Sequence, residues 1–332
     1  MANKNILTTQ SKVVQVESNY YLPTAVLPSS NTIPLGTTYC FLSKVEPWDD
    51  DNDPTQPTGD TYYLKQTFKN MFAAKLVQTS DISPVVPRID WTQNTVYDYY
   101  RDDVDMTELN ENGNLVYQYY VKNKYDQVFK CLWNNNGGES TYEPYFEPGS
   151  YGTNGIYQNA DGYKWKFMYS IDSGLKVKFM DDTWIPVAVG ANTPNPLQTT
   201  AGAGSIDVIN LTDGGALYDP ANSVITVTIT GDGTGASATA YVPDGMNGIA
   251  DIRVVSPGSG YTYANVSITS ASGFGAQAFA PISPIGGHGY DPVSELGCTR
   301  VMFSVEFNGD EGGIVPTDIT YHQVGVVVNP TL

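Results

Sequence analysis

A duplicated, glycine-rich segment in the second half of the chain constrains the fold more than any other sequence feature. Residues 199–285 contain thirteen Gly and six Asp, lack Lys, Glu, Trp and Cys, and carry Arg253 as their only basic residue. Two similar units follow one another here, with Tyr218 and Tyr261 at matching positions and a Gly-x-Gly-Ala block in each. The blocks are Gly233-Thr234-Gly235-Ala236 and Gly273-Phe274-Gly275-Ala276. Two copies predict a small closed β domain, since a solenoid needs about three or more repeats.

The composition on either side of this segment predicts that it is an insertion. The offset between the two units is 44 residues at the first Gly, 43 at Tyr and 40 at the Gly-x-Gly-Ala block, as expected for β units with different loop lengths. After residue 285 the composition of the first half returns. We therefore expect a core domain from residues 1–198 plus 286–332 and an inserted domain at 199–285. Domain ends usually lie close together, which lets a core close across an insertion.

Hydrophobic patterning predicts a mainly β fold with a few helices and a β-sandwich-like core. Eight runs rich in β-branched and aromatic residues read as strands: Val13–Val16, Thr38–Leu42, Leu115–Val121, Gln127–Trp133, Lys164–Ile171, Trp184–Val189, Thr299–Phe307 and Thr320–Val328. One amphipathic helix is expected over Thr61–Leu76, with Asp60 as its N-cap. Its apolar face consists of Leu64, Phe68, Met71 and Phe72. Residues 143–160 read as a long loop.

Charge and composition exclude several classes of function. The net charge of −18, from 35 acidic and 17 basic residues, disfavours nucleic acids and anionic membranes as partners. Only 16% of residues are charged, and the polar surface comes largely from amides, hydroxyls and 24 Tyr, which suits extended protein–protein contact. The same residues are common in any all-β protein with many turns. Neither a signal peptide nor an apolar run of membrane-spanning length is expected. Cys40, Cys131 and Cys298 are odd in number and widely spaced, which argues against a disulfide framework.

Three possible catalytic or ligand sites have simpler interpretations. His288 lies in a glycine-rich turn beside Asp291, but without a nucleophile elbow the turn is expected to serve only as the re-entry into the core domain. The segment 231–235 resembles a phosphate-binding loop, yet it lacks the Lys-Ser/Thr of a P-loop and reads as a β turn. The acidic run 49–53 could bind Ca²⁺ but lacks the spacing of an EF-hand. We therefore expect no enzymatic activity, no cofactor, no small-molecule substrate and no catalytic or metal-ligating residue, and leave cation binding at 49–53 open.

Binding or cleavage of carbohydrate is the main alternative from composition. Acidic, Tyr-rich β proteins often bind sugars, and paired carboxylates can hydrolyse glycosides. Several acidic residues lie between 143 and 182, but nothing in their spacing selects a pair. The five Trp lie in strand-like segments or motifs, which favours core packing over a sugar platform.

Four short motifs, in order along the chain, carry a family resemblance. They are Ser43-Lys44-Val45-Glu46-Pro47-Trp48, Pro87-Arg88-Ile89-Asp90-Trp91, Tyr163-Lys164-Trp165-Lys166-Phe167 and the segment 321–330, which contains Gln323. With these motifs at these spacings, the chain resembles the baseplate wedge proteins of contractile-tailed phages of the T-even type. In that family one domain is carried within a loop of another, and homodimers sit in each wedge.

The resemblance implies a structural role in the virion. We expect a homodimer that is assembled in the host cytoplasm into the tail baseplate, joins neighbouring wedge proteins and takes part in the rearrangement on tail contraction. The alternative is a receptor- or glycan-binding tail module. Within the motifs, Glu46 and Pro47 are expected to end a strand so that Trp48 folds back on the core, and Arg88 to pair with Glu46 or Asp90. Trp91 closes the second motif, and alternation of Tyr163 and Trp165 predicts a strand with one buried face.

Two departures from the family pattern limit the resemblance. Family members usually have Phe-Arg before the Gln of the last motif, where this chain has Tyr321-His322. The strand is expected to persist, but a charge role of that Arg does not carry over. The glycine-rich segment 199–285 does not match the T-even insert by motif, so its contacts stay open.

Overall fold

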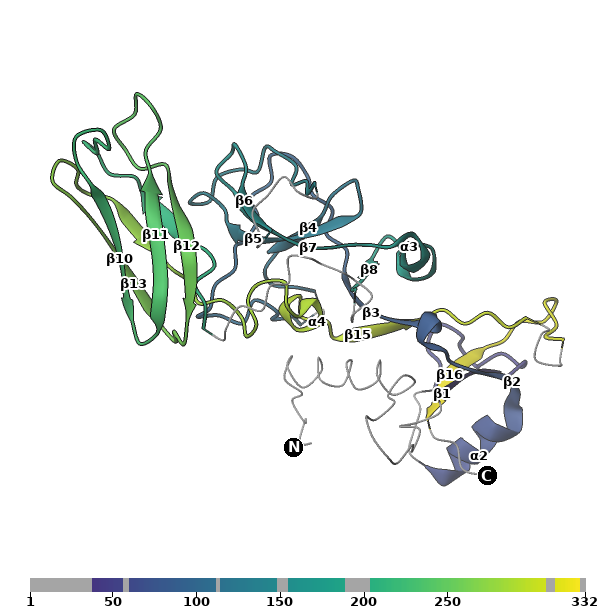
Figure 1. Cartoon of the computed structure of the whole chain (residues 1–332). Coiled ribbons are helices and arrows are strands. Elements are labelled where there is room, and N and C mark those ends of the chain that lie inside the picture. The colour runs from purple at the N-terminus through teal and green to yellow at the C-terminus, as the bar shows by residue number, and fades with distance from the viewer. Residues whose placement is uncertain are drawn as a thin grey trace.

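The computed structural model describes residues 38–55, 60–111, 114–147, 155–188, 204–308 and 314–328. It is mainly β, with 37% strand and 9% helix, which confirms the predicted fold class. The molecule is elongated (Figure 1). Strands from the glycine-rich segment lie at one end, a small sheet that includes residues 38–43 lies at the other, and two sheets lie between them.

The two central sheets share one hydrophobic core. The first has the order β15-β3-β8, with β3 at Ile82–Pro87, β8 at Trp184–Pro186 and β15 at Arg300–Phe303. The second has the order β4-β5-β7-β6, with β4 at Tyr120–Lys122, β5 at Gln127–Trp133, β6 at Ile156–Gln158 and β7 at Lys164–Ser170. Val86 and Ile185 of the first sheet meet Val128 and Met168 of the second in this core. Two layers therefore bury one apolar interior, as the hydrophobic effect requires of half-apolar sheets.

The second sheet is buried on its other face as well. Phe129, Trp165 and Phe167 belong to a separate aromatic cluster, which Tyr97 and Phe146 complete. Every residue of β7 except Ser170 is buried. The expectation that the third motif has one buried face is therefore wrong, because loops before β4 and before β6 cover the second face.

Short helices adjoin the central sheets. Helix α3, Ser173–Phe179, begins at Asp172, whose side chain accepts a hydrogen bond from the Gly174 amide. Helix α4, Pro292–Glu295, has Pro at its first turn and Asp291 as its cap. Both starts follow the usual preference for a side-chain acceptor at the N-cap.

The small distal sheet has the order β16-β1-β2, with β1 at Thr38–Ser43, β2 at Met71–Leu76 and β16 at Gln323–Val328. Helix α2, Thr61–Asn70, precedes β2 and is capped by Asp60, as predicted. The predicted helix over 61–76 is wrong in its second half, because Met71–Leu76 pairs with β1. Helical periodicity describes local sequence only, and a non-local ladder of backbone hydrogen bonds overrides it here.

Several other predicted elements differ from the structure at their ends. The run Leu115–Val121 forms a strand only from Tyr120, and Thr299–Phe307 only over Arg300–Phe303. The predicted loop at 143–160 contains the short strand β6. The predicted strand at 13–16 lies outside the described residues. Cys40, Cys131 and Cys298 are all buried free thiols.

The glycine-rich segment forms six strands that pair with one another. They are β9 at Asn210–Asp213, β10 at Ile225–Gly231, β11 at Thr234–Tyr241, β12 at Asp251–Ser259, β13 at Ala264–Ser270 and β14 at Gln277–Phe279. One sheet has the order β10-β13-β14-β9, and the other pairs β11 with β12. Among the described residues, their shared core draws on residues from 206 to 282.

The two sequence units complete each other in three dimensions. The Tyr261 hydroxyl of the second unit accepts a hydrogen bond from the Ala236 amide of the first, and Tyr218 accepts from Ala276 in the same way. Two backbone hydrogen bonds, both 2.8 Å, link the units in the same reciprocal way. The Ile206 amide donates to the Pro257 oxygen, and the Ile249 amide donates to the Gly214 oxygen. Each tyrosine ring lies against a glycine of the opposite block, Gly273 for Tyr218 and Gly233 for Tyr261, where an added Cβ would collide with the ring. The Gly-x-Gly-Ala blocks thus admit a tyrosine from the other unit, which explains the repeat.

Within the described residues no helix is long and apolar enough to cross a membrane.

Candidate functional site

The first and last motifs form one site beside the distal sheet. Ser43 lies opposite Gln323 in the β1–β16 ladder. The indole nitrogen of Trp48 donates a 2.7 Å hydrogen bond to the backbone oxygen of His322, and the His322 amide donates to the Lys44 oxygen. Trp48 is half-buried, and the Lys44 ammonium lies over its indole ring, 4.6 Å from the ring centroid. The expected return of Trp48 toward the fold is present, but the residue packs on the last motif.

Glu46 and Pro47 are exposed in this turn. The Pro47 oxygen accepts a hydrogen bond from the Lys44 ammonium, whereas Arg88 pairs with Asp90. Of the two partners expected for Arg88, the structure therefore selects Asp90. His322 has its Nδ1 3.0 Å from Asp51 and so contacts the acidic run 49–53.

The second motif joins the central sheets at their edge. Pro87 ends β3, and the Arg88 guanidinium lies 2.9 Å from Asp90, which in turn lies 3.3 Å from the Lys122 ammonium. Burial would raise the pKa of Asp90, but the hydrogen bond from Arg88 and the charge of Lys122 lower it. The Trp91 indole donates to the Ser140 hydroxyl at 3.0 Å and packs against the aromatic cluster.

The third motif supplies both buried aromatics and buried lysines. Tyr163 and Trp165 stack with ring centroids 5.5 Å apart, and both are fully buried. Lys164 and Lys166 alternate with them on β7 and are also buried. Burial of both lysines is not expected from the sequence, because alternation of Lys with aromatics is the usual signature of a half-exposed strand.

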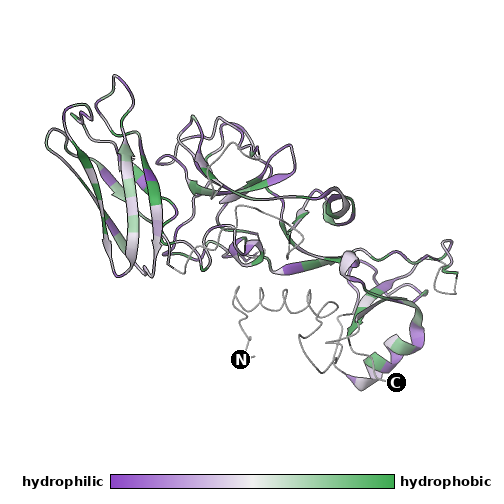
Figure 2. Cartoon of the chain, in the orientation of Figure 1, coloured by the Kyte–Doolittle hydropathy of each residue, from purple (hydrophilic) through white to green (hydrophobic). Residues whose placement is uncertain are grey.

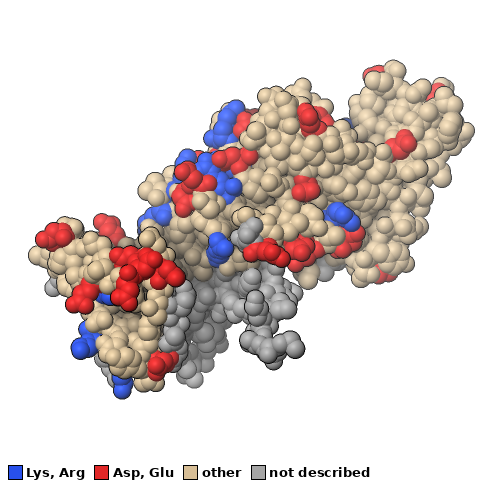
Figure 3. Space-filling model, turned by 180° about the vertical axis from the view of Figure 1, so that it is seen from behind, with Lys and Arg blue, Asp and Glu red and all other residues tan. Residues whose placement is uncertain are grey.

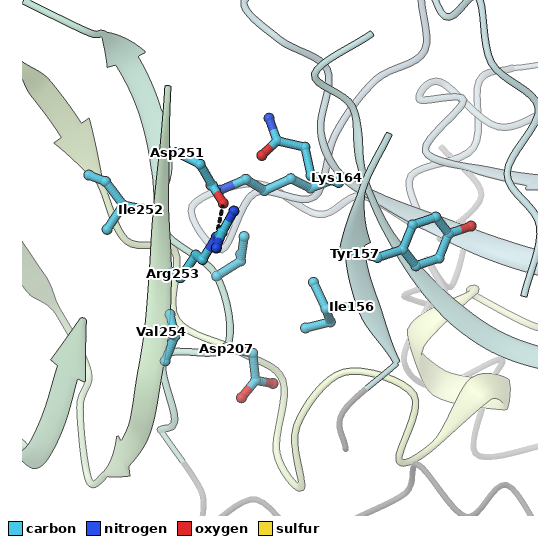
Figure 4. Close-up of a pocket in the computed structure, with 10 residues that line it drawn as sticks. Ile156, Tyr157, Lys164, Asp207, Asp251, Ile252, Arg253 and Val254 are labelled. Carbon is cyan, nitrogen blue, oxygen red and sulfur yellow. Dashed lines mark hydrogen bonds and ion pairs between the residues drawn. The ribbon is translucent and has the colours of Figure 1, made fainter. Parts of the chain in front are cut away.

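Lys164 connects the central sheets to the glycine-rich segment. Its ammonium lies 2.9 Å from Asp251 on β12 and donates to the Ile209 oxygen at 2.6 Å. Figure 4 shows Lys164 reaching toward Asp251, with Arg253 beside it, at the rim of a pocket of about 170 Å³. Arg253 also lies 3.2 Å from Asp251. The pocket walls come from β6 and β7 on one side and β12 on the other, so it marks the junction of two parts of the fold.

A second, deeper ionic group lies on the same side of β7. The Lys130 ammonium is 2.8 Å from Glu295, and His288 Nδ1 is 3.8 Å from the same carboxylate. Lys130 lies over the Tyr100 ring at 4.3 Å, and His288 meets that ring edge-on at 4.7 Å. Burial would raise the pKa of Glu295, but the Lys130 charge and His288 lower it to about 2.

This ionic group has the contacts of a structural centre. Glu295 also accepts hydrogen bonds from the Gly289 and Asp291 amides and so fixes the turn by which the chain re-enters the central sheets. His288 is 4% exposed, and burial together with the nearby Lys130 charge lowers its pKa. Within the described residues no group of three or more His, Cys, Asp or Glu could hold a metal ion.

The polar groups of the glycine loop at 231–235 make hydrogen bonds within the protein. It turns β10 into β11, and the Asp232 carboxylate accepts hydrogen bonds from the Thr262 amide and hydroxyl at 2.8 and 2.6 Å. These bonds lower the pKa of Asp232 to about 2. The loop therefore has the contacts of a turn that joins the two units.

Helix α2 presents its apolar side to solvent. On the helix, Leu64 and Phe68 are 47% and 54% exposed, and no helix residue is buried. Phe72, near the start of β2, is 47% exposed. The side that faces the fold carries Tyr63, Gln66 and Thr67, which line a pocket of about 390 Å³ with Trp48 and Gln323. Figure 2 shows hydrophobic and hydrophilic residues alternating along α2. The amphipathic helix is thus reversed relative to the usual orientation, in which the apolar stripe faces the core.

The same end of the molecule carries opposite charges. Asp49, Asp50, Asp51 and Asp53 are exposed in the loop after β1, and Lys65 and Lys69 are exposed on α2. Figure 3 shows acidic side chains gathered at this end and few charges at the opposite end. Exposed apolar side chains on a helix, together with exposed lysines and an acidic loop at the same end, make a surface suited to protein contact. We refer to Leu64, Lys65, Phe68, Lys69, Phe72 and the acidic run 49–53 as the distal surface.

Comparison with models of known protein families and with curated proteins gives no match to this chain.

Proposed function

We propose that this protein is a structural subunit of the baseplate wedge of a contractile phage tail and that it acts as a homodimer. The observation that carries the proposal is the reversed helix α2, which exposes Leu64 and Phe68 at the end of the molecule where Phe72 of β2 is also exposed. The choice of a baseplate wedge, among other assemblies, comes from the four sequence motifs that resemble those of the wedge proteins. We also propose that the protein is located in the virion and that it contacts neighbouring wedge proteins there.

The distal surface can contact a second copy of itself. An isologous interface requires that one patch be its own complement, so that each feature meets its counterpart across a twofold axis. Here the lysines of α2 in one copy can lie against the acidic run 49–53 of the other, while the apolar helix faces meet between them. Burial of apolar area supplies the affinity, and the charge pairs fix the register. The interface leaves the opposite end of the molecule available to other wedge proteins.

The first test is multi-angle light scattering on the purified chain, alone and mixed with other wedge proteins of the same phage. We expect a dimer at micromolar concentration that enters a larger stoichiometric complex. The variant Phe68→Ser should dissociate the dimer, because it removes an apolar contact at the centre of the interface. The matched control is Val177→Ser on α3, since Val177 is 87% exposed but lies outside the distal surface.

A stable monomer that ignores the other wedge proteins would overturn the proposal. A glycan array then tests the alternative of a receptor- or glycan-binding tail module, for which selective hits are expected. A dimer that Phe68→Ser leaves intact would keep the assembly role and exclude α2 from the interface.

A further inference from the structure

At one turn, the two units of the glycine-rich segment have the same backbone conformation but different residues. Leu217 precedes Tyr218 in the first unit, and Gly260 precedes Tyr261 in the second. Both residues have positive φ, 63° for Leu217 and 78° for Gly260. Glycine adopts this conformation freely, whereas a leucine there is strained by its Cβ. The fold accommodates Gly at this turn, so Leu217 carries a conformational cost that glycine would avoid.

The Leu217 side chain is not used by the core. It is 54% exposed, whereas the neighbouring Tyr218 is 2% exposed and fills the core of the segment. A strained residue whose side chain points to solvent has no packing energy to offset the strain. Backbone strain of this kind is concentrated at ligand-binding sites, which motivates a search for one beside Leu217.

A groove of about 610 Å³ lies beside this turn. One wall is the turn at 217–221, and the other is the loop 242–247, which joins β11 to β12 and rises at the free end of the sheets (Figure 1). The Asn247 oxygen accepts a hydrogen bond from the Tyr218 amide and ties the two walls together. Met246, at 67% exposure, adds a second accessible apolar side chain, and Val242 lies buried at the base. The volume is in the range of grooves that hold a few residues of a ligand.

The lining selects the chemistry of the occupant. Its accessible apolar groups are aliphatic or thioether, and the one aromatic residue that lines it, Tyr218, is buried, so the groove offers no open ring for a sugar to stack on. Thioether and leucine side chains adapt to apolar side chains of varied shape. Asp219 and Asp244 stand at the rim, and the residues that line the groove include no Lys or Arg. Asp219 is held by the Ala221 and Asn222 amides, which keeps its charge in place.

We propose that the groove formed by Leu217, Val242, Asp244 and Met246 binds a segment of a protein partner that has an apolar anchor residue flanked by Lys or Arg. The anchor lies between Leu217 and Met246, and the basic residues lie near the two rim carboxylates. The net negative charge of the whole segment also favours a basic partner, because residues 199–285 contain six Asp and only one basic residue, Arg253. The site is at the end of the molecule opposite the distal surface and does not depend on the proposed dimer.

The test is selection of a random peptide library, displayed on an unrelated carrier, against the wild-type protein and against Leu217→Gly. Leu217→Gly installs the residue that the second unit already has, so the fold is retained and its melting temperature should not fall. We expect peptides with an apolar residue next to Lys or Arg to be enriched on the wild type alone. A synthesised peptide from that set should bind at least about tenfold more weakly to Leu217→Gly and to Asp244→Asn. The matched control is Val255→Ser, since Val255 is 67% exposed on β12 but does not line the groove.

Three results would overturn the proposal. The first is equal enrichment on the wild type and on Leu217→Gly. The second is enrichment of acidic or uncharged peptides, which contradicts the charge match. The third is a glycan-array signal that Leu217→Gly abolishes, which would assign the groove to a sugar. Light scattering on Leu217→Gly separates this site from the dimer, because the oligomeric state should be unchanged whether or not peptide binding is lost.

Discussion

The ammonium of Lys164 lies 2.9 Å from a carboxylate oxygen of Asp251, and this ion pair links β7 of the central sheets to β12 of the glycine-rich segment. The two side chains are 7% and 13% exposed. Burial lowers the pKa of Lys164, and the charge of Asp251 opposes that effect. A buried pair with a further hydrogen bond to the Ile209 oxygen tolerates the loss of neither partner alone. The pair therefore holds the two parts of the fold in one relative position.

We expect Lys164→Met to lower the free energy of unfolding by about 2 kcal/mol, because it removes the buried one of the two cations that contact the Asp251 carboxylate and leaves only Arg253. Asp251→Asn should have a similar cost. The double variant should lose less than the sum of the two, since both single changes break the same Lys164–Asp251 contact. Urea unfolding followed by tryptophan fluorescence measures all four proteins. Additive losses would show that the two residues act independently and would contradict a coupling across the junction.

The Lys130–Glu295 pair should make the fold sensitive to acid. The pKa of Glu295 is about 2 in the folded protein and near 4.5 when unfolded, so its contribution is complete above pH 4.5 and is lost as the pH falls toward 2. The gap corresponds to about 3 kcal/mol. Glu295→Gln should remove this part of the acid limb and lower the stability at pH 7. Urea midpoints between pH 2 and 7 for both proteins test this, and parallel curves would contradict it.

Local patterning predicted the elements whose contacts are close in sequence. The Asp60 cap, the strand Gln127–Trp133 and the tyrosine–glycine repeat are all present, because each depends on residues a few positions apart or on a duplicated pattern. The segment Met71–Leu76 was misassigned, since its partner strand begins at Thr38 and the period of the apolar residues also fits a helix.

The ionic groups could not be predicted in the same way. Lys130 and Glu295 are 165 residues apart, and Lys164 and Asp251 meet only because the glycine-rich segment packs on β7. Lysine in a strand indicates a solvent-facing position unless a distant carboxylate is known. One signal was available for the groove: the 43-residue offset that aligns Tyr218 with Tyr261 also aligns Leu217 with Gly260.

Lys166 should have the opposite pH dependence to Glu295. Burial lowers its pKa to about 8, against the partial opposition of Glu295, from an ordinary value of 10.5. The folded protein therefore releases this proton first, and stability should rise between pH 8 and 10.5. Lys166→Met should remove that rise, because the variant has no ammonium at this position to release a proton. The matched control is Lys178→Met, which replaces an exposed lysine on α3, outside the distal surface, and should leave the alkaline rise in place. A Lys166→Met variant whose stability still rises between pH 8 and 10.5 would contradict the prediction.

Giving each repeat unit the turn residue of the other should change stability in opposite directions, with a gain for Leu217→Gly and a loss for Gly260→Leu. Leu217→Gly relieves a left-handed leucine, and we expect a gain of about 1 kcal/mol after the greater entropy of glycine in the unfolded chain is subtracted. Gly260→Leu should cost about 1–2 kcal/mol through the backbone alone, because a Cβ at Gly260 meets nothing closer than the Gly233 Cα at 3.9 Å. Leu217→Ala is the control, since it removes the exposed side chain and keeps the strained backbone, and it should change stability little. Thermal and urea unfolding of the three variants decide the matter. A loss on Leu217→Gly comparable to that on Gly260→Leu would mean that the leucine stabilises the turn, and the argument that it is kept for binding would then fail.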